Sequence, residues 1–154
     1  MKIRLATPAD ADELVRLRGI MLGSVSRTDW DDDWREPARE SLIRRLAAAE
    51  PVLAAAVAER PDGSGLAASA VGLIEERLGG PGNPGGRVGY IFSVVTDPDM
   101  RRRGYSRACV EALLEWFRTR GVPVADLRAS PDGEPLYTSL GFARTSDPAM
   151  RMRL

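Results

Sequence analysis

The segment 87–121 constrains the fold of this chain more than any other. It begins with Arg87–Thr96, a run of aromatic and β-branched residues that predicts a strand. An arginine-rich turn follows, and a helix is predicted from about Gly104 to Arg120, where Gly121 ends it. Its apolar residues share one face: Cys109, Leu113, Trp116 and Phe117. A strand joined directly to an amphipathic helix is typical of domains in which helices pack on a sheet.

The remaining patterns extend this unit in both directions. Strands are predicted at Lys2–Ala6, Val52–Glu59, Leu66–Arg77 and Val122–Ala129, and one or two within Arg144–Leu154. Helices are predicted after the cap Thr7-Pro8-Ala9-Asp10, from near Pro37, and over Pro135–Leu140. The order β-α-α-β-β-β-α-β-α-β indicates a mixed α/β fold class. With 154 residues, no repeats and no long linker, residues 1–154 are expected to form a single domain.

The composition excludes several kinds of chemistry. The chain has no histidine, one cysteine and one lysine, Lys2. A serine–histidine or cysteine–histidine pair, a zinc site and a lysine Schiff base are therefore not expected, and no metal is predicted. The formal net charge of zero gives no general attraction to nucleic acid or an anionic membrane. No apolar run approaches the roughly 20 residues that span a bilayer. One cysteine and a start directly in a strand pattern favour a cytoplasmic protein.

Two stretches compete as phosphate sites. Gly80–Gly85 matches the dinucleotide pattern G-x-G-x-x-G, but that motif requires a helix directly after it, and here a strand is predicted instead. Pro81 and Pro84 also remove two backbone donors. We therefore interpret this stretch as a flexible loop between two antiparallel strands.

The turn Thr96–Ser106 has the required context, with a strand before it and a helix after it. The first N–H groups of a helix lack intrahelical partners and lie at the positive end of the helix dipole. Arginines are disfavoured there, so the run 101–103 indicates an external anion. Gly104 lets the backbone approach that anion, and Ser106 keeps the next turn small. The sequence therefore predicts a pyrophosphate site at this turn.

The motif Arg101-x-x-Gly104-x-Ser106, after a strand ending Val94-Val95-Thr96-Asp97-Pro98, resembles the signature of the GNAT superfamily of N-acetyltransferases. The family's usual last position is Gly or Ala, so Ser106 departs from it. Pro135–Phe142 resembles the family's short helix ending in Leu-Gly-Phe. With the strand order, the resemblance covers essentially the whole chain. It implies a central, mostly antiparallel sheet with a splayed parallel strand pair, flanked by helices.

The resemblance also implies acetyl-CoA as co-substrate and assigns residues to it. Backbone groups of Val94, Val95 and Thr96 would pair with the pantetheine arm and orient the thioester carbonyl. Tyr137 matches the family tyrosine that often protonates the departing thiolate. Cys109 lies on a packed face and is expected to be inert, which disfavours a ping-pong route. The pyrophosphate would be held by Arg101, Arg102, Arg103, Gly104, Tyr105, Ser106 and Arg107.

The general base is left open by the sequence. Glu75 and Glu76, near the end of the third strand, are candidates, but strand alternation lets only one of them face the cleft. Asp126 approximately matches a carboxylate that some family members carry on the strand after the long helix. A water chain to solvent is an equal alternative.

The acceptor is also left open, between a small-molecule amine and a peptide amine. The acidic stretch Asp29–Glu36, interleaved with Trp30 and Trp34, falls where the family has its substrate-covering loop. Carboxylates beside indoles suit a cationic amine, although an ordinary solvated loop explains them equally well.

The predicted activity is direct transfer of an acetyl group to a primary amine. The alternatives are a catalytically degenerate acyl-CoA sensor or interaction module, and transfer to oxygen or to a hydroxylamine. A monomer or a homodimer is expected.

Overall fold

The computed structural model describes residues 1–25 and 31–154. Its elements, in chain order, are β1 (Ile3–Leu5), the 3-10 turn η1 (Pro8–Asp10), α1 (Ala11–Val25), α2 (Arg35–Leu46), β2 (Leu53–Glu59), β3 (Leu66–Glu76), β4 (Arg87–Thr96), the 3-10 turn η2 (Pro98–Met100), α3 (Tyr105–Thr119), β5 (Ala125–Leu127) and α4 (Glu134–Ser139). Among the residues described, no helix combines the length and apolarity needed to cross a membrane.

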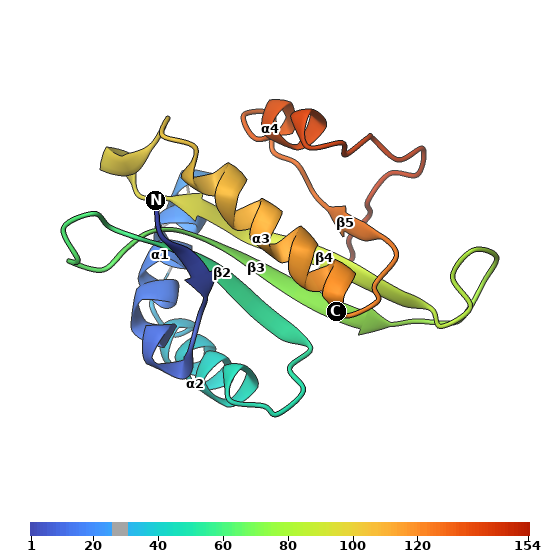
Figure 1. The fold of residues 1–154 in the computed structure, drawn as a ribbon, viewed down its shortest axis with the longest axis horizontal. Coiled ribbons are helices and arrows are strands. Elements are labelled where there is room, and N and C mark those ends of the chain that lie inside the picture. Colours follow the sequence, from blue (N-terminus) through green and yellow to red (C-terminus); the bar gives the residue numbers. More distant parts are fainter. Residues whose placement is uncertain (26–30) are drawn as a thin grey trace.

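The strands form one five-stranded sheet in the order β1-β2-β3-β4-β5. Neighbours pair antiparallel as far as β4, whereas β4 and β5 are parallel. Helices α1 and α2 cover one face and α3 lies on the other (Figure 1). The prediction of a mixed α/β fold with one parallel strand pair is confirmed.

Helix α3 approaches the sheet closely because two strands have glycine beneath it. The buried face of α3 includes Leu113 and Phe117, which lie over β3 and β4. A Cβ added at Gly72 would lie 3.0 Å from the Phe117 ring, and one at Gly89 would lie 2.8 Å from it. The distance at Gly89 is shorter than carbon–carbon contacts allow, and the distance at Gly72 is tighter than most such contacts, so glycine at both positions lets the helix approach the sheet closely.

The hairpin between β3 and β4 contains the glycine-rich stretch 80–85. Its two strands pair antiparallel up to Glu76 and Arg87, and Asn83 Nδ2 donates to the Arg87 carbonyl at 3.0 Å. No helix follows the loop, so the dinucleotide reading is excluded and the prediction of a loop between antiparallel strands is confirmed.

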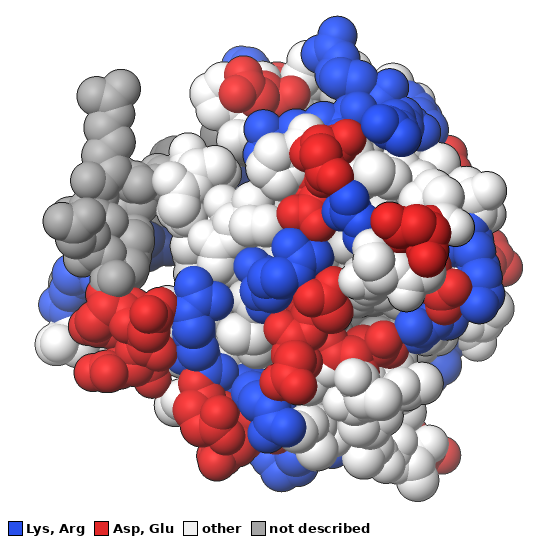
Figure 2. All heavy atoms as spheres, turned by 90° about the vertical axis from the view of Figure 1, so that its left-hand side faces the viewer, with Lys and Arg blue, Asp and Glu red and all other residues white. Residues whose placement is uncertain are grey.

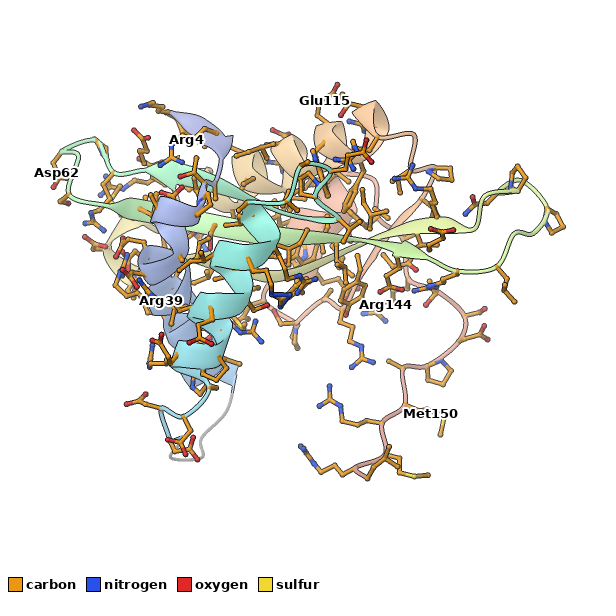
Figure 3. All side chains as sticks on the ribbon, turned by 90° about the horizontal axis from the view of Figure 1, so that it is seen from below. Arg4, Arg39, Asp62, Glu115, Arg144 and Met150 are labelled. Carbon is orange, nitrogen blue, oxygen red and sulfur yellow. The ribbon has the colours of Figure 1, made fainter. Side chains whose placement is uncertain are left out.

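Two sequence-based expectations at the carboxyl end are wrong. The strand predicted over Val122–Ala129 is limited to Ala125–Leu127. The segment Arg144–Leu154, predicted as one or two strands, has no regular secondary structure. Met150 and Met152 alternate with arginines, but they are 87% and 80% exposed, on a segment that runs away from the sheet (Figure 3). Alternation expresses only a propensity, and a strand also requires a partner for its hydrogen bonds.

Candidate functional site

The centre of the site is an unpaired edge on β4. The parallel pairing with β5 runs from Gly89 opposite Ala125 to Ile91 opposite Leu127, and then β5 ends. Strand β4 continues to Thr96, still paired with β3 on its other side. Its last five residues therefore have a free edge where β5 has left the sheet, which is the splay that the family resemblance implies.

A bulge in β4 lies at the start of this free edge. Phe92 pairs with Val71 and Val95 pairs with Ser69, so two β4 residues stand opposite the single β3 residue Ala70. The bulged residue Ser93 has a positive φ of 52°, which is rare for a residue with a side chain. Residues 92–95 include no glycine, so no residue type in this stretch indicates the bulge.

The bulge changes which backbone groups face the free edge. The Gly89 N–H donates to the Val124 carbonyl, so alternation turns the N–H groups of Ile91 and Ser93 toward the β5 side. Beyond the bulge, the Asp97 N–H donates to Ala67 of β3 at 2.8 Å. Alternation back from Asp97 therefore turns the backbone groups of Thr96 and Val94 to the free edge. Val95 instead directs its backbone toward Ser69 and its side chain into the core.

The free edge leads into the arginine-rich turn, where the backbone reverses. Arg102 and Gly104 have positive φ values of 63° and 82°, and α3 begins at Tyr105. Helix α3 runs for 15 residues, so its first N–H groups and its dipole both favour an anion in front of it. The Arg101, Arg102 and Arg103 side chains are exposed.

Side-chain contacts fix this turn to the rest of the site. Thr96 Oγ1 and Ser106 Oγ lie 2.6 Å apart, which ties the end of β4 to the first turn of α3. Arg107 Nη2 donates to Ser139 Oγ at 2.5 Å, which ties α3 to α4. Serine at position 106 thus serves as a hydrogen-bonding partner of the strand, besides being small.

Asp97 anchors the start of the turn, a role that sequence reasoning missed. Asp97 as a whole is 6% exposed, and its carboxylate accepts hydrogen bonds from Arg16 of α1 at 2.9 and 3.0 Å and from Arg60 at 2.9 Å. Arg60 also pairs with Asp99 in η2. Figure 2 views this end of the molecule and shows acidic and basic groups interleaved over it. Two arginines from distant segments converge here, which no local motif could reveal.

Tyr137 lies on α4, which ends as the family resemblance implies. The Phe142 N–H donates to the Tyr137 carbonyl at 3.0 Å, and Gly141 has a φ of 101°, as in a Schellman cap. The Tyr137 ring is 9% exposed and packs edge-on against Phe142, with centroids 6.0 Å apart. Burial raises the pKa of the phenol, and no partner among the described residues offsets this effect.

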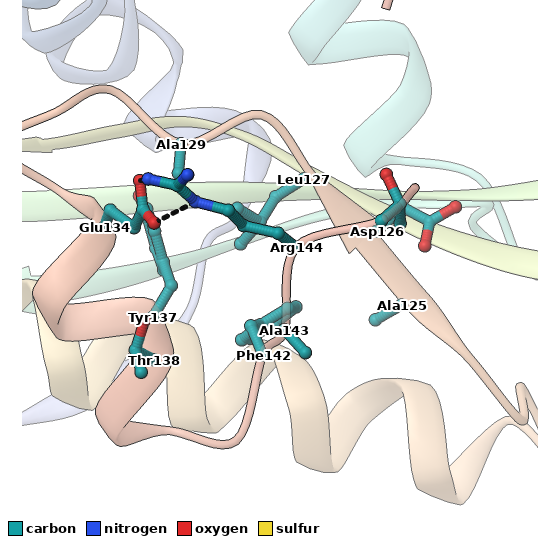
Figure 4. A pocket seen from close by; sticks show the side chains of 11 residues that line it. Ala125, Asp126, Leu127, Ala129, Glu134, Tyr137, Thr138, Phe142, Ala143 and Arg144 are labelled. Atoms are coloured by element: carbon teal, nitrogen blue, oxygen red, sulfur yellow. Dashed lines mark hydrogen bonds and ion pairs between the residues drawn. The ribbon is translucent and has the colours of Figure 1, made fainter. Parts of the chain in front are cut away.

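A cavity of about 410 Å³ lies between β5, α4 and the segment 142–145. Figure 4 shows Tyr137 and Asp126 in its lining, on opposite sides, with the Asp126 carboxylate turned away from the phenol. An ion pair between Arg144 and Glu134 lies on the α4 side of the cavity, at 2.5 Å between Nε and Oε1.

The three acidic candidates are not brought together. Asp126 stands opposite Tyr90, next to the splay. Its neighbours Ala125 and Leu127 pack toward α3, so the Asp126 side chain points to the face that α1 and α2 cover. Glu75 is on β3, two strands away, and its carboxylate pairs with Arg77 at 2.8 Å. Glu76 is exposed at the end of the same strand.

The acidic stretch between the first two helices is only partly described. Asp29 and Trp30 fall outside the described residues. The Asp32 carboxylate pairs with Arg35 at 2.7 Å, and the same guanidinium lies 4.6 Å from the centroid of the Trp34 ring. Asp32 and Trp34 belong to the carboxylates and indoles that were expected to attract a cationic amine, and both already contact Arg35 of the chain itself.

Cys109 is fully buried on α3, and burial raises the pKa of its thiol to about 12. It stays a thiol at neutral pH.

A strand with a bulged free edge that leads into a cationic turn and a helix N-terminus is the arrangement of an acyl-CoA-dependent acetyltransferase. Residues 21–142 match the model of the acetyltransferase (GNAT) family, and the chain belongs to this family of N-acetyltransferases, which use acetyl-CoA.

Curated relatives match part of the chain. A glucosamine 6-phosphate N-acetyltransferase of Trypanosoma brucei brucei is 39% identical over 71 residues, 46% of this chain and 48% of the relative. A [ribosomal protein bS18]-alanine N-acetyltransferase of Salmonella typhimurium is 42% identical over 55 residues, 34% of this chain and 37% of the relative. The matched regions thus span about half or less of these relatives.

Solved structures match almost the whole chain. A predicted acetyltransferase from Clostridium acetobutylicum, crystallised with acetyl-CoA, has a TM-score of 0.85 and 24% identity, covering 98% of this chain and 95% of that one. A GCN5-related N-acetyltransferase from Ralstonia eutropha JMP134 has a TM-score of 0.82 and 26% identity, covering 98% and 97%.

Proposed function

We propose that residues 1–154 form one acetyl-CoA-dependent N-acetyltransferase domain that transfers the acetyl group directly to a primary amine. The observation that carries this proposal is the free edge of β4 leading into the 101–107 turn. An extended pantetheine arm requires backbone partners along one line, and a pyrophosphate requires donors at its end. The chain offers both in the right order, so its residues fit acetyl-CoA.

The free edge would bind and orient the arm. Val94 and Thr96 turn backbone groups toward the arm. The backbone of Val95 is directed toward β3, so Val95 would help to orient the arm by holding the strand in place and not by contacting the arm. Ser93 and Val94 have consecutive N–H groups on the free edge, and these are the donors available to a carbonyl oxygen. When bound, acetyl-CoA supplies the activated thioester.

The turn and the first turn of α3 would hold the pyrophosphate. Arg102 and Gly104 reverse the backbone so that the N–H groups of Tyr105, Ser106 and Arg107 lie at the front of α3. The exposed side chains of Arg101 and Arg103 would add charge-assisted hydrogen bonds.

Tyr137 would protonate the sulfur as the carbon–sulfur bond breaks and the carbon–nitrogen bond forms. Burial keeps the phenol protonated at neutral pH, as a general acid must be. The proton released by the amine would pass to Asp126 or along water. Asp126 is better placed than Glu75, because Asp126 stands beside the splay and Glu75 is paired with Arg77.

The acceptor is proposed only as a class, an amine of a small molecule or of a peptide. The two curated relatives act on a sugar phosphate and on a ribosomal protein, so both kinds occur among proteins similar to parts of this chain. A cytoplasmic location stays a prediction based on the single cysteine.

The experiment is coenzyme A release with a panel of amines, for the wild type and for Tyr137→Phe. Turnover on at least one amine, lowered in the variant, supports the proposal. Tight acetyl-CoA binding without turnover on any amine would favour the sensor instead. Hydroxyl and hydroxylamine acceptors are assayed beside the amines, and turnover on these acceptors alone would favour acetyl transfer to oxygen or to a hydroxylamine.

A further inference from the structure

Arg18 on α1 is a partly buried cation that has no role in the acetyl transfer proposed above. It follows Leu14 by one helical turn and precedes Met21 by three residues. Both neighbours pack in the core cluster that also includes Phe92 of β4. Residues at these spacings share one face of a helix, so Arg18 lies along the side of α1 that faces the sheet.

No carboxylate neutralises Arg18 within residues 1–25 and 31–154, where it makes neither an ion pair nor a hydrogen bond. Arg16, two residues earlier, pairs with both Glu13 and Asp97. Burial alone lowers the pKa of Arg18, whereas hydrogen bonds to these carboxylates raise that of Arg16. A guanidinium withdrawn from water without a counter-charge destabilises the fold.

The surroundings of Arg18 suit a bound molecule. Helix α1 packs on β4 and β3, and Figure 3 views the face of the sheet that α1 and α2 cover. On this face β4 presents Tyr90 and Phe92, stacked with centroids 6.1 Å apart and only partly buried. Asp126 stands beside Tyr90 at the point where β4 and β5 separate. The same face therefore carries a cation, two aromatic rings and a carboxylate next to the splay.

We propose that Arg18 binds an anionic group, a phosphate or a carboxylate, on the acceptor. The acceptor class is then an amine that also carries a negative charge. A guanidinium matches either anion with two parallel hydrogen bonds, and the bound anion offsets the free energy that burial costs. This inference rests on the proposed function for its setting, while the anion site itself can be tested without turnover.

The activity test compares matched amines, 2-aminoethyl phosphate against ethanolamine and β-alanine against propylamine. The wild type is expected to favour the charged member of at least one pair by about 10- to 100-fold in kcat/KM, the value of hydrogen bonds to a charged group. The pair that shows the preference distinguishes phosphate from carboxylate. In Arg18→Gln the ratio of kcat/KM for the charged amine to kcat/KM for the neutral amine should fall toward one.

Arg118→Gln is the matched control, since that arginine is on α3 and its side chain is 67% exposed. It should keep the wild-type ratio. Equal use of charged and neutral amines by the wild type, or an unchanged ratio in Arg18→Gln, would overturn the proposal.

The second test is thermal unfolding with saturating coenzyme A, which keeps anions from the 101–107 turn. Arg18→Gln should melt no lower than the wild type, because it removes an uncompensated charge. Inorganic phosphate or 2-aminoethyl phosphate should raise the Tm of the wild type and of Arg118→Gln but not that of Arg18→Gln. A lower Tm for Arg18→Gln with no anion effect would make Arg18 a structural residue. An anion effect without turnover on any amine would refute the acetyl transfer and keep the anion site.

Discussion

At the scale of single residues, the environment of Tyr137 decides what its hydroxyl can do. The ring is buried beside Phe142, and burial disfavours the phenolate. A phenol ordinarily has a pKa of about 10, so the raised pKa keeps Tyr137 protonated beyond that pH. The phenol should therefore remain protonated, and able to donate a proton, at every pH in the neutral range.

The pH dependence of kcat tests this assignment. If Tyr137 is the general acid, any alkaline fall in kcat due to it has its midpoint above the ordinary phenol pKa of about 10, because the protonated form is the active one and burial raises its pKa. Tyr137→Phe should lower kcat by about 10²-fold and leave acetyl-CoA affinity unchanged. An unchanged kcat in this variant would leave Tyr137 as a packing residue.

Asp97 gives a prediction on stability. Asp97→Ala leaves Arg16 and Arg60 facing each other without their shared carboxylate. Both arginines keep some contact with solvent, so we expect a loss of about 2 to 3 kcal/mol in the free energy of unfolding, which is less than the loss of about 3 to 5 kcal/mol for a broken pair that is fully buried.

Asp99→Ala is the control for Asp97→Ala, because Asp99 also pairs with Arg60 but is 62% exposed. It should cost less than about 1 kcal/mol, as surface pairs do. Urea unfolding measures both variants, and equal losses would contradict the anchoring role of Asp97.

At the scale of elements, the packing of α3 on the sheet fixes where its N-terminus points. Phe117 is 2% exposed and sits over Gly89, so it has no room to move away. Gly89→Ala should therefore overpack this contact and lower the free energy of unfolding by about 1 to 3 kcal/mol.

Gly85→Ala, in the β3–β4 hairpin, is the matched control for Gly89→Ala. A Cβ there meets nothing within 4 Å. Its effect should stay within about 0.5 kcal/mol, the usual range for surface positions. A Gly89→Ala variant as stable as this control would show that α3 is free to shift on the sheet.

The elements differ in how far the sequence could predict them. Arg87–Thr96 and the helix after Gly104 follow from β-propensity and helical spacing, and the structure confirms both. The bulge at Ser93 could not be predicted, because no glycine or proline marks it and its cause is the pairing with β3. The strand predicted within Arg144–Leu154 is wrong because strand pairing, which the sequence pattern does not contain, decides there too. The alternation of apolar and polar residues is present, but no partner strand pairs with this segment in the described structure.

At the scale of the whole molecule, the site joins segments far apart in the sequence. The roles proposed for Val94 and Gly104 follow from one local motif. The convergence of Arg16 and Arg60 on Asp97, and the placement of Arg18 on the face that carries Asp126, depend on how α1 crosses the sheet. Tertiary packing sets these relations, so the residues of the proposed acceptor side do not follow from a local motif, whereas those of the proposed acetyl-CoA site do.

The relatives also differ in what they share with this chain. Structures that share the fold over nearly the whole chain are 24% and 26% identical to it. The curated relatives are more similar over shorter stretches, and they act on different acceptors. We propose that an acetyl-CoA site common to the family, with an acceptor side that differs between its members, accounts for both observations.

The most direct test is titration of acetyl-CoA into the wild type, Gly104→Glu and Gly63→Glu, with heat of binding as the readout. Gly104 and Gly63 both have positive φ and little around them, at 82° and 75°, so the two substitutions impose similar backbone strain. Only Gly104 lies in the turn before α3. We predict that the wild type and Gly63→Glu bind acetyl-CoA alike, while Gly104→Glu stays folded and does not bind. Binding by Gly104→Glu with the wild-type affinity would contradict the assignment of the 101–107 turn as the pyrophosphate site.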